Sequence, residues 1–443
     1  MSFSETIFAL ASGRGRAGVA VVRISGPGAM AALEGLSRKP RPKARRAVLC
    51  PIYRRQDKSL IDQSLAIIFP APNSFTGEDV VELHLHGGPA ILTALFGELS
   101  AFDGFRPAEP GEFTRRAFEH GKMDLTEAEG LGDLVNAETE AQARQALRQM
   151  QGELGRLYDG WRETLIGALA HLEADIDFPD EDLPDSVAVA ITPKIADLRA
   201  EIESHLADGH RGEKIREGLD VVILGQPNVG KSSLLNALAR KEAAIVSDEA
   251  GTTRDIIEVP MDLAGYPVTI ADTAGLRDSE NVIEREGVRR ARARAAAADI
   301  RLFMTTQDAP DIPPEFTDLF EKNDYLLINK ADLGGKDIRN DPAKRLFSLS
   351  VKSGEGVDGF MAALEKDVTE RLDLSGAPAL TRLRHRQALE ECVDALRRFE
   401  AAREPELAAE DVRLAVRALG RITGRVDVED ILDVIFGDFC IGK

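Results

Sequence analysis

An eight-residue loop at positions 225–232 constrains the fold more than any other part of the sequence. It reads Gly-Gln-Pro-Asn-Val-Gly-Lys-Ser and lies between a β-like run at residues 220–224 and a helical run at residues 233–240. Its glycines let backbone N–H groups turn inward around phosphates, and the start of the following helix adds a favourable dipole. We expect Lys231 to reach the outer phosphates of a nucleotide and Ser232 to bind Mg²⁺. The alternative is a chance match in a structural turn, and three further motifs argue against it.

The first two of these motifs suit the metal and the γ-phosphate. Residues 272–275 read Asp-Thr-Ala-Gly and end a β-like run, where a carboxylate can hold the Mg²⁺ shell and a glycine N–H can sense the γ-phosphate. Residues 251–255 read Gly-Thr-Thr-Arg-Asp and supply Thr253 as a second Mg²⁺ ligand.

The third motif, with a short loop after it, suits the base. Residues 329–332 read Asn-Lys-Ala-Asp, and Asp332 can accept hydrogen bonds from guanine N1–H and N2–H, which adenine cannot reproduce. Residues 350–352, Ser-Val-Lys, fit the last base-contacting loop. Together the motifs predict a guanine-nucleotide site. Its expected contacts are Asn228, Val229, Gly230, Lys231, Ser232, Ser233, Asp272, Thr273, Ala274, Gly275, Asn329, Lys330, Asp332, Ser350, Val351 and Lys352.

Hydrolysis needs a water-orienting group that the usual position lacks. Leu276 stands where Ras-like enzymes place a glutamine, and leucine cannot orient water. Asn228 could instead bind a monovalent cation that neutralises charge. Glu284 is close enough in sequence to orient the water and is the catalytic candidate, although the residues alone favour an exposed helical acid at that position.

Composition sets the class of protein and its setting. The chain has 443 residues, enough for two to four domains, and its 56 basic and 75 acidic residues give a net charge of −19. That balance argues against bulk coating of nucleic acid. Three cysteines cannot form a disulfide framework, no run approaches the ~20 apolar residues of a membrane span, and the start lacks a basic signal region. We therefore expect a cytoplasmic protein with no membrane contact.

The texture of the sequence predicts a multidomain α/β protein. Short β-like runs broken by Pro and Gly predict an α+β domain over residues 1–118, and helical periodicity follows over residues 119–216. Strands alternating with helices over residues 217–373 predict a parallel-type sheet with helices on both faces. Helical periodicity resumes over residues 374–443, so we expect this Ras-like G domain to be inserted into a discontinuous helical domain.

With these motifs in place, the whole chain resembles the MnmE (TrmE) family of tRNA modification GTPases. Additional marks are Val-Arg-Ile-Ser-Gly at residues 22–26, Pro-Asn-Ser-Phe-Thr-Gly-Glu-Asp at 72–79, Gly-Glu-Phe-Thr-Arg-Arg-Ala-Phe at 111–118 and the ending Phe-Cys-Ile-Gly-Lys at 439–443. The resemblance implies a homodimer joined through folate-binding N-terminal domains. It also implies K⁺-stimulated GTP hydrolysis and an FAD-dependent MnmG-type partner, in a complex that is a heterotetramer or larger. Together these proteins would install aminomethyl-type groups, such as 5-carboxymethylaminomethyl, on the wobble uridine (U34) of tRNA.

The same resemblance assigns roles to matching positions. It implies a K⁺ site at Asn228, Ser247, Glu249 and Thr252, with Ser247 and Thr252 also counted among the GTP contacts; a Mg²⁺ site at Ser232 and Thr253; and a water-positioning role for Glu284. It implies contacts to 5-formyltetrahydrofolate, or a related tetrahydrofolate, from Arg23, Glu82, Lys122 and Lys443. It favours a functional thiol at Cys440, whereas the residues alone leave a disordered tail equally open.

Weaker signals carry two interpretations each. Residues 13–18 match a dinucleotide fingerprint but precede a β-like run where a helix is required, so we reject an NAD site. His84 and His86 favour a packed or hydrogen-bonded pair over a metal site. The basic run at residues 38–46, continued by Arg54, Arg55 and Lys58, is a solvated loop or a tRNA phosphate contact. A ribosome-assembly GTPase or a nucleotide-gated scaffold is the alternative function.

Overall fold

The computed structural model describes the chain except residues 1–3, 14, 178–185, 242–256, 273–281, 335–339, 342–343, 374–375, 377, 403, 427–428, 438 and 443. The chain divides into two compact units, which are described separately. The first contains Met1–Gly132, Met150–Thr164 and Val416–Lys443, and the second contains Asp133–Gln149 and Leu165–Ala415. Among the described helices, none combines the length and the apolar character that crossing a membrane requires.

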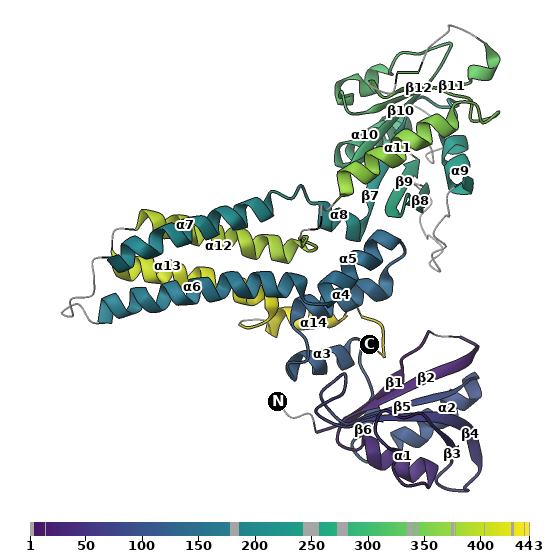
Figure 1. Ribbon diagram of the computed structural model, residues 1–443. Coiled ribbons are helices and arrows are strands. Elements are labelled where there is room, and N and C mark those ends of the chain that lie inside the picture. The colour runs from purple at the N-terminus through teal and green to yellow at the C-terminus, as the bar shows by residue number, and fades with distance from the viewer. Residues whose placement is uncertain are drawn as a thin grey trace. The chain divides into compact units, whose positions relative to one another are not determined.

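The first unit is built on a six-stranded sheet with the order β3-β4-β5-β2-β1-β6 (Figure 1). Neighbouring strands are antiparallel except β1 and β6, which are parallel. The strands are β1 (Thr6–Leu10), β2 (Ala17–Ser25), β3 (Val48–Tyr53), β4 (Leu60–Phe69), β5 (Val80–Gly87) and β6 (Phe105–Pro107). The short β-like runs expected within residues 1–118 are confirmed, and residues 19–24 and 65–69 are parts of β2 and β4.

Two helices cover one face of this sheet. Helices α1 (Ala29–Ser37) and α2 (Pro89–Ser100) share an apolar core with Val22, Ile24 and Leu83. Because side chains alternate across a strand, Arg23 and Glu82 project to the other face. That open face carries Arg23 and Glu82, two of the four positions that the family resemblance implies for folate.

The first unit also contains helices that follow the sheet in sequence, together with the last helix of the chain. They include α3 (Glu112–Glu119), the start of α4 (Leu125–Asn136) and α14 (Glu429–Gly437). Leu125 and Ala128 of α4 form an apolar cluster with Leu432 and Phe436 of α14. This cluster joins the last helix of the chain to residues that follow the sheet in sequence.

The second unit contains a sheet with the order β12-β11-β10-β7-β9-β8. Its strands are β7 (Leu219–Leu224), β8 (Ile257–Leu263), β9 (Tyr266–Asp272), β10 (Ile300–Thr306), β11 (Tyr325–Asn329) and β12 (Leu346–Ser348). All neighbours are parallel except β8 and β9. The β-like run at residues 220–224 is confirmed as part of β7, and the alternation of strands and helices expected over residues 217–373 is confirmed by β9, β10 and β11 with their helices.

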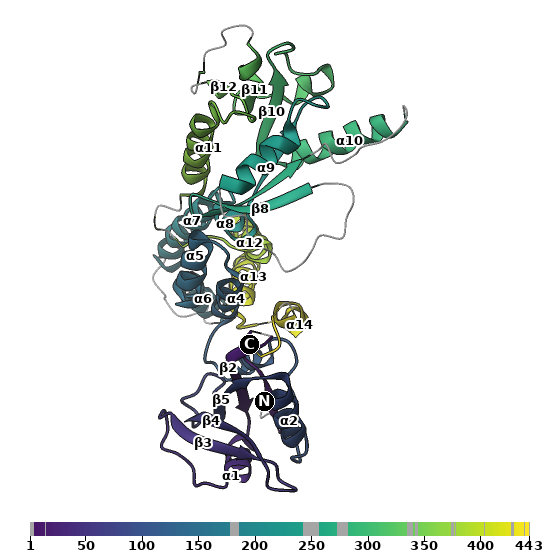
Figure 2. The ribbon, with the colours of Figure 1, turned by 90° about the vertical axis from the view of Figure 1, so that its right-hand side faces the viewer.

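Helices cover both faces of this sheet (Figure 2). Val221 and Ile223 of β7 pack with apolar residues of α9 (Lys231–Lys241) and α11 (Val357–Leu372). The alternate residues Val222 and Leu224 pack with Ala291 and Ala295 of α10 (Val282–Ala297). The expected α/β domain with a parallel-type sheet is confirmed, since a strand buried on both faces needs a helical layer on each.

Helices of 7 to 25 residues precede and follow this sheet in the sequence, as the periodicity predicted. They are α5 (Glu140–Met150), α6 (Glu153–Asp177), α7 (Ser186–Leu206), α8 (Arg211–Glu217), α12 (Leu383–Ala401) and α13 (Pro405–Thr423). Helices α7 and α12 pack together, with Ile195 and Leu389 fully buried. In α6, apolar residues recur at three- and four-residue spacing; Trp161, Leu165 and Leu172 are buried, and Leu169 and Ile176 are partly buried.

Candidate functional site

The phosphate loop joins the end of β7 to the start of α9, and its backbone requires glycine at two positions. Gly225 has φ 147°, and a Cβ there would lie 2.2 Å from the Met304 carbonyl oxygen. Gly230 has φ 109°, and a Cβ there would lie 2.4 Å from Asn329 Nδ2. Asn228 adopts a left-handed conformation with φ 64°. The loop therefore turns tightly beside two neighbouring strands, as phosphate cradles do.

Lys231 closes this loop on itself. Its Nζ donates to the carbonyl oxygens of Gly225 at 2.7 Å and Gln226 at 2.9 Å. The side chain is buried, and burial lowers the pKa of the ammonium while the nearby charge of Asp272 opposes that effect. A cation that is largely removed from water and held by neutral carbonyls would gain most from an anionic partner, and a nucleotide phosphate supplies one.

Ser232 and Asp272 lie together at the ends of α9 and β9. Ser232 Oγ donates to Asp272 Oδ2 at 2.5 Å, and Asp272 is fully buried. A hydroxyl oxygen beside a carboxylate is the kind of hard oxygen donor set that Mg²⁺ prefers. The two residues present therefore fit a magnesium ion shared with a nucleotide.

Asn329 connects the base-recognition motif to the phosphate loop. Its Nδ2 donates to the Val229 carbonyl oxygen at 2.7 Å, and its Oδ1 accepts from the Val351 N–H at 3.1 Å. The side chain thus links the end of β11 to both the phosphate loop and the loop at residues 350–352. Three motifs that are far apart in sequence meet at this one buried amide.

Asp332 is held in place by the last loop. Ser350 Oγ donates to Asp332 Oδ1 at 2.7 Å, and the same hydroxyl oxygen accepts from the Ser353 N–H at 3.2 Å. Asp332 itself is solvent-exposed, whereas Ser350 is fully buried. A buried hydroxyl therefore fixes the orientation of an accessible carboxylate, which suits recognition of a base edge.

Several predicted nucleotide and cation contacts lie outside the described residues. These are Ser247, Glu249, Thr252, Thr253, Thr273, Ala274 and Gly275. Glu284 belongs to α10, but its side chain is also outside the described part of the structure. Their assignments stay predictions.

On the open face of the first sheet, Arg23 and Glu82 form a cross-strand pair. They are register partners of β2 and β5, and Arg23 Nη2 lies 2.9 Å from Glu82 Oε1. The Arg23 guanidinium also lies 5.1 Å from the centroid of the Phe75 ring and 5.7 Å from that of Phe113. A carboxylate and aromatic rings around one cation make a polar platform with apolar walls, which fits a flat, hydrogen-bonding ligand.

The other predicted folate contacts approach this unit from different segments. Lys122 is exposed, and its Cε lies beside Gly77, 3.4 Å from where a Cβ would stand. In the tail, Ile441 forms a bridge with Pro110, and a Cβ on Gly442 would lie 2.0 Å from the Leu10 carbonyl oxygen. The tail is therefore docked at residue 442, and its Cys440 is exposed. Lys443 lies outside the described residues.

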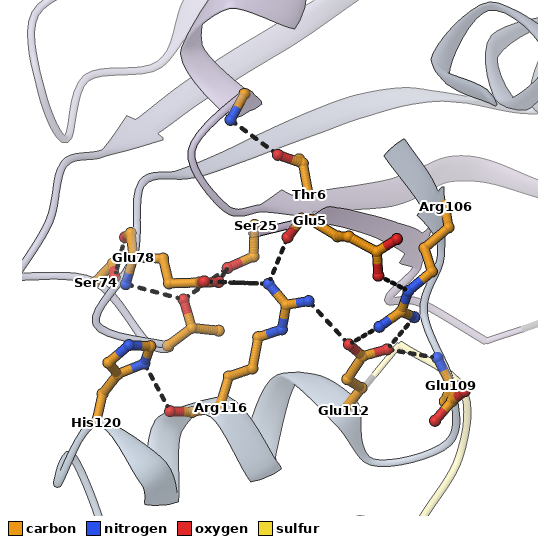
Figure 3. Close-up of polar contacts among 12 residues, drawn as sticks. Glu5, Thr6, Ser25, Ser74, Glu78, Arg106, Glu109, Glu112, Arg116 and His120 are labelled. Atoms are coloured by element: carbon orange, nitrogen blue, oxygen red, sulfur yellow. Dashed lines mark hydrogen bonds and ion pairs between the residues drawn. The ribbon is translucent and has the colours of Figure 1, made fainter. Parts of the chain in front are cut away.

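A buried ionic network, carried in part by α3, was not anticipated from the sequence (Figure 3). The fully buried Arg116 donates to Glu78 Oε2 at 3.0 Å and to Glu112 Oε1 at 2.9 Å. Glu112 also accepts two hydrogen bonds from Arg106, at 2.6 and 2.7 Å. The conspicuous polar runs at residues 72–79 and 111–118 were the available signal, since they supply Glu78, Glu112 and Arg116. The network fixes the loop and helix that carry Phe75 and Phe113.

The weaker sequence signals also have local explanations. Strand β2 begins at Ala17, so the glycine-rich residues 13–18 lead into a strand, as expected. His86 Nδ1 lies 2.8 Å from Asp62 Oδ1, and His84 Nε2 lies 3.8 Å from Glu82 Oε2. The described residues contain no group of three or more His, Cys, Asp or Glu side chains arranged to hold a metal ion.

Comparisons with known proteins find matches for both the N-terminal part and the remainder of the chain. Residues 125–440 match the MnmE helical domain, and residues 6–122 match the N-terminus of the GTP-binding protein TrmE. The chain is 54% identical to the tRNA modification GTPase MnmE of Parvibaculum lavamentivorans over 443 residues, covering 99% of this chain and 100% of that protein. The MnmE of Rhodospirillum rubrum is also 54% identical, over 455 residues and 99% of each chain.

A more distant relative carries a different name. The mitochondrial 5-taurinomethyluridine-(tRNA) synthase subunit GTPB3 of Danio rerio is 46% identical over 469 residues, covering 99% of this chain and 93% of that protein. The helical match spans more than half of the chain, and the relatives are aligned over almost all of it. The chain therefore belongs to the MnmE family of tRNA modification GTPases.

Proposed function

We propose that this protein hydrolyses GTP to GDP and phosphate with K⁺ stimulation, as part of the modification of the wobble uridine of tRNA. In this proposal it acts as a homodimer with an FAD-dependent partner and uses a tetrahydrofolate as the one-carbon donor. The product is a 5-carboxymethylaminomethyl or aminomethyl uridine. The name of the Danio rerio relative, which refers to 5-taurinomethyluridine, supports chemistry at position 5 of a uridine.

The observation that carries the proposal is the linkage of the guanine motif to the phosphate loop through Asn329. The amide holds Val229 on one side and Val351 on the other. Ser350 then orients the carboxylate of Asp332, which pairs with the two N–H groups that guanine presents and adenine lacks. Base selection and phosphate binding thus share one set of hydrogen bonds.

The residues around the phosphates act by position and charge. Lys231 exchanges its loop carbonyls for the outer phosphate oxygens, while Ser232 and Thr253 would bind Mg²⁺ and Asp272 would hold its outer shell. Bound Mg²⁺ and K⁺ supply positive charge that offsets the charge developing on the transferring phosphoryl group. Asn228 is the described residue of the proposed K⁺ site, and Glu284 orients the attacking water.

The open face of the first sheet serves folate binding and dimerisation in this proposal. Arg23 and Glu82 bind the polar edge of the folate beside the partly buried Phe75, and the buried Phe113 supports the Arg23 guanidinium from below. Leu49 and Leu65 are register partners on β3 and β4 and are 57% and 46% exposed. An exposed apolar cross-strand pair is a suitable contact for a second copy of the chain.

GTP turnover in matched K⁺ and Na⁺ buffers tests the hydrolytic part. We expect turnover at least about 10-fold faster in K⁺, and Glu284→Ala should reduce it by about 100-fold while nucleotide affinity stays within twofold. Glu286→Ala, two residues along the same helix, is the matched control and should behave as wild type. Equal turnover in the two salts would contradict the proposed K⁺ site. A Glu284→Ala variant with wild-type turnover would exclude Glu284 from the hydrolytic mechanism.

The nucleotide-gated scaffold is the competing function within the same fold. It predicts slow hydrolysis that does not respond to K⁺ and partner binding that depends only on the bound nucleotide. The ribosome-assembly alternative predicts binding to ribosomal RNA in place of tRNA. The same turnover assay, followed by binding to each RNA, separates the three functions.

A further inference from the structure

The edge of the first sheet carries an unusual concentration of positive charge. Residues 38–58 contain nine Lys and Arg side chains and a single acidic residue, Asp57, in a chain whose net charge is −19. All nine are solvent-exposed. We call Arg38, Lys39, Arg41, Lys43, Arg45, Arg46, Arg54, Arg55 and Lys58 the basic strip.

The basic strip flanks the edge strand β3: six of its residues precede the strand in sequence and three follow it. Strand β3 is the terminal strand of the sheet order, and the backbone continues its pairing upstream, where the Arg45 N–H donates to the Ile68 carbonyl oxygen (Figure 1). At the other end, the Arg54 N–H donates to the Ser59 carbonyl oxygen. At about 3.3 Å per residue, the five steps of β3 from Val48 to Tyr53 cover roughly 17 Å, and the strip residues lie beyond both ends of the strand.

Three arginines of the strip are oriented without being neutralised. Arg38 donates to the Arg54 carbonyl oxygen at 3.2 Å and lies 5.0 Å from the centroid of the Tyr53 ring. Arg55 donates to the Ala101 carbonyl oxygen at 3.0 Å and lies 4.2 Å from the centroid of the Phe102 ring. Neutral carbonyls and ring faces fix a guanidinium in space but leave its full charge for an anion.

The third arginine, Arg45, precedes β3 and is held in the same way. Arg45 donates to the Asn73 carbonyl oxygen and lies 5.7 Å from the centroid of the Phe69 ring. Among the described residues, Arg41 is the one member of the strip with a carboxylate ion-pair partner, Glu34. The basic strip thus differs from the arginines of the long helices, where Arg397, Arg398 and Arg413 are each paired with a carboxylate.

We propose that the basic strip binds the phosphate backbone of tRNA. Positioned but uncompensated guanidinium groups on both sides of β3 match the phosphodiesters of a nucleic-acid backbone, which accept paired N–H donors. This inference rests on the proposed role in tRNA modification and adds the surface that contacts the RNA. It assigns the contact to the backbone, so the strip contributes affinity and leaves the choice of tRNA to other contacts.

The test measures binding of labelled tRNA to the full chain by fluorescence anisotropy between about 50 and 200 mM salt. One variant carries Arg38→Gln, Arg45→Gln and Arg55→Gln, and a second carries Lys39→Gln, Lys43→Gln and Arg46→Gln. The matched control removes the same charge from the helices with Arg397→Gln, Arg398→Gln and Arg413→Gln. Thermal melting verifies that each variant is folded, and the second variant remains informative if the first is destabilised.

We expect each strip variant to weaken binding at low salt by at least about 10-fold. The slope of log K against log salt should become shallower by about 0.7–0.9 for each phosphate that the variant no longer neutralises. The control should bind within twofold of wild type. Equal losses of affinity in the strip and control variants, or unchanged binding in both strip variants, would overturn the proposal.

Two further outcomes separate this inference from its competitors. A basic edge can instead protect a sheet from pairing with another sheet, and strip variants that self-associate while binding tRNA normally would establish that role and overturn ours. K⁺-stimulated GTP turnover of the same variants should equal wild type. Absence of K⁺ stimulation in the wild-type chain would refute the proposed function. Strip variants that lose tRNA binding but keep K⁺-stimulated turnover would support tRNA binding by the basic strip.

Discussion

The side-chain amide of Asn329 donates to the backbone carbonyl of Val229 at 2.7 Å. Asn329 ends β11 and Val229 belongs to the phosphate loop, so one hydrogen bond joins the base-recognition motif to the phosphate cradle. Gly230 makes this contact possible, because a Cβ there would meet the same amide nitrogen at 2.4 Å. Nucleotide affinity should therefore depend on Asn329 although the residue need not touch a phosphate.

Replacing Asn329 with alanine should lower GDP and GTP affinity by about 10- to 100-fold. Two backbone groups, the buried Val229 carbonyl and the partly buried Val351 N–H, lose a partner, at about 1–1.5 kcal/mol each. Fluorescent-nucleotide titration measures the effect. Asn340→Ala is the control, since Asn340 accepts from the Ser348 N–H away from the phosphate loop. Equal affinity in the Asn329→Ala variant would refute the linkage.

Asp332→Asn should change which base the protein prefers. A carboxylate accepts from two guanine N–H groups, and losing charge-assisted bonds should weaken GTP binding by at least about 100-fold. The asparagine N–H can donate to the additional oxygen of xanthine, so xanthosine triphosphate should bind more tightly to the variant than GTP does. The orienting bond from Ser350 survives because the asparagine oxygen still accepts it. Competition titration between GTP and xanthosine triphosphate measures the preference, with Asp341→Asn as the control. An unchanged preference for GTP in the Asp332→Asn variant would exclude Asp332 from base recognition.

The stability of the N-terminal unit should fall in acid because of Glu112. Burial opposes ionisation of this carboxyl, but hydrogen bonds from Arg106, the Glu109 N–H and Arg116 hold its pKa below the usual 4.5. A folded-state pKa that is depressed stabilises the fold above pH 4.5, and this contribution is lost as pH falls through the folded-state value. Hydrogen exchange at residues 105–119, corrected for intrinsic pH dependence, should therefore lose protection below pH 4.5.

A Glu112→Gln variant should remove that pH dependence. It should also lower protection at neutral pH by about 1–3 kcal/mol, because charged hydrogen bonds to two arginines are weakened. Glu109→Gln is the control, since the Glu109 backbone N–H still reaches Glu112 while its own side chain is exposed. A Glu112→Gln variant with the wild-type acid profile would show that another group governs the transition.

Arg23→Ala should weaken binding of 5-formyltetrahydrofolate by about 10-fold or more. The change removes the cation between Phe75 and Phe113 and leaves the partly buried Glu82 without its partner. Isothermal titration with the free folate measures the loss. Arg46→Ala removes one exposed positive charge from the same unit and should leave folate affinity unchanged. Wild-type folate affinity in the Arg23→Ala variant would show that Arg23 does not contribute to the folate site.

The central sheet and its motifs were predictable because their signals are local. Continuous apolar runs predict the buried strands β7, β9, β10 and β11. The motifs that follow these strands are continuous stretches of sequence, so they can be recognised without knowledge of the fold. Strand β6 was not predictable, since Phe105–Pro107 has three residues and is defined by pairing with β1. The docking of Gly442 against Leu10 and the burial of Arg116 depend on partners far away in sequence. No local pattern specifies such contacts.

The central claim is that this GTPase is required for modification of the tRNA wobble uridine. Nucleoside mass spectrometry of tRNA from cells lacking the gene tests it most directly, with the wild-type and Asp332→Asn genes returned separately. The account predicts that the aminomethyl-type wobble uridines disappear, that the wild-type gene restores them and that the variant restores them poorly. Intact wobble-uridine modification in cells without the gene would contradict it.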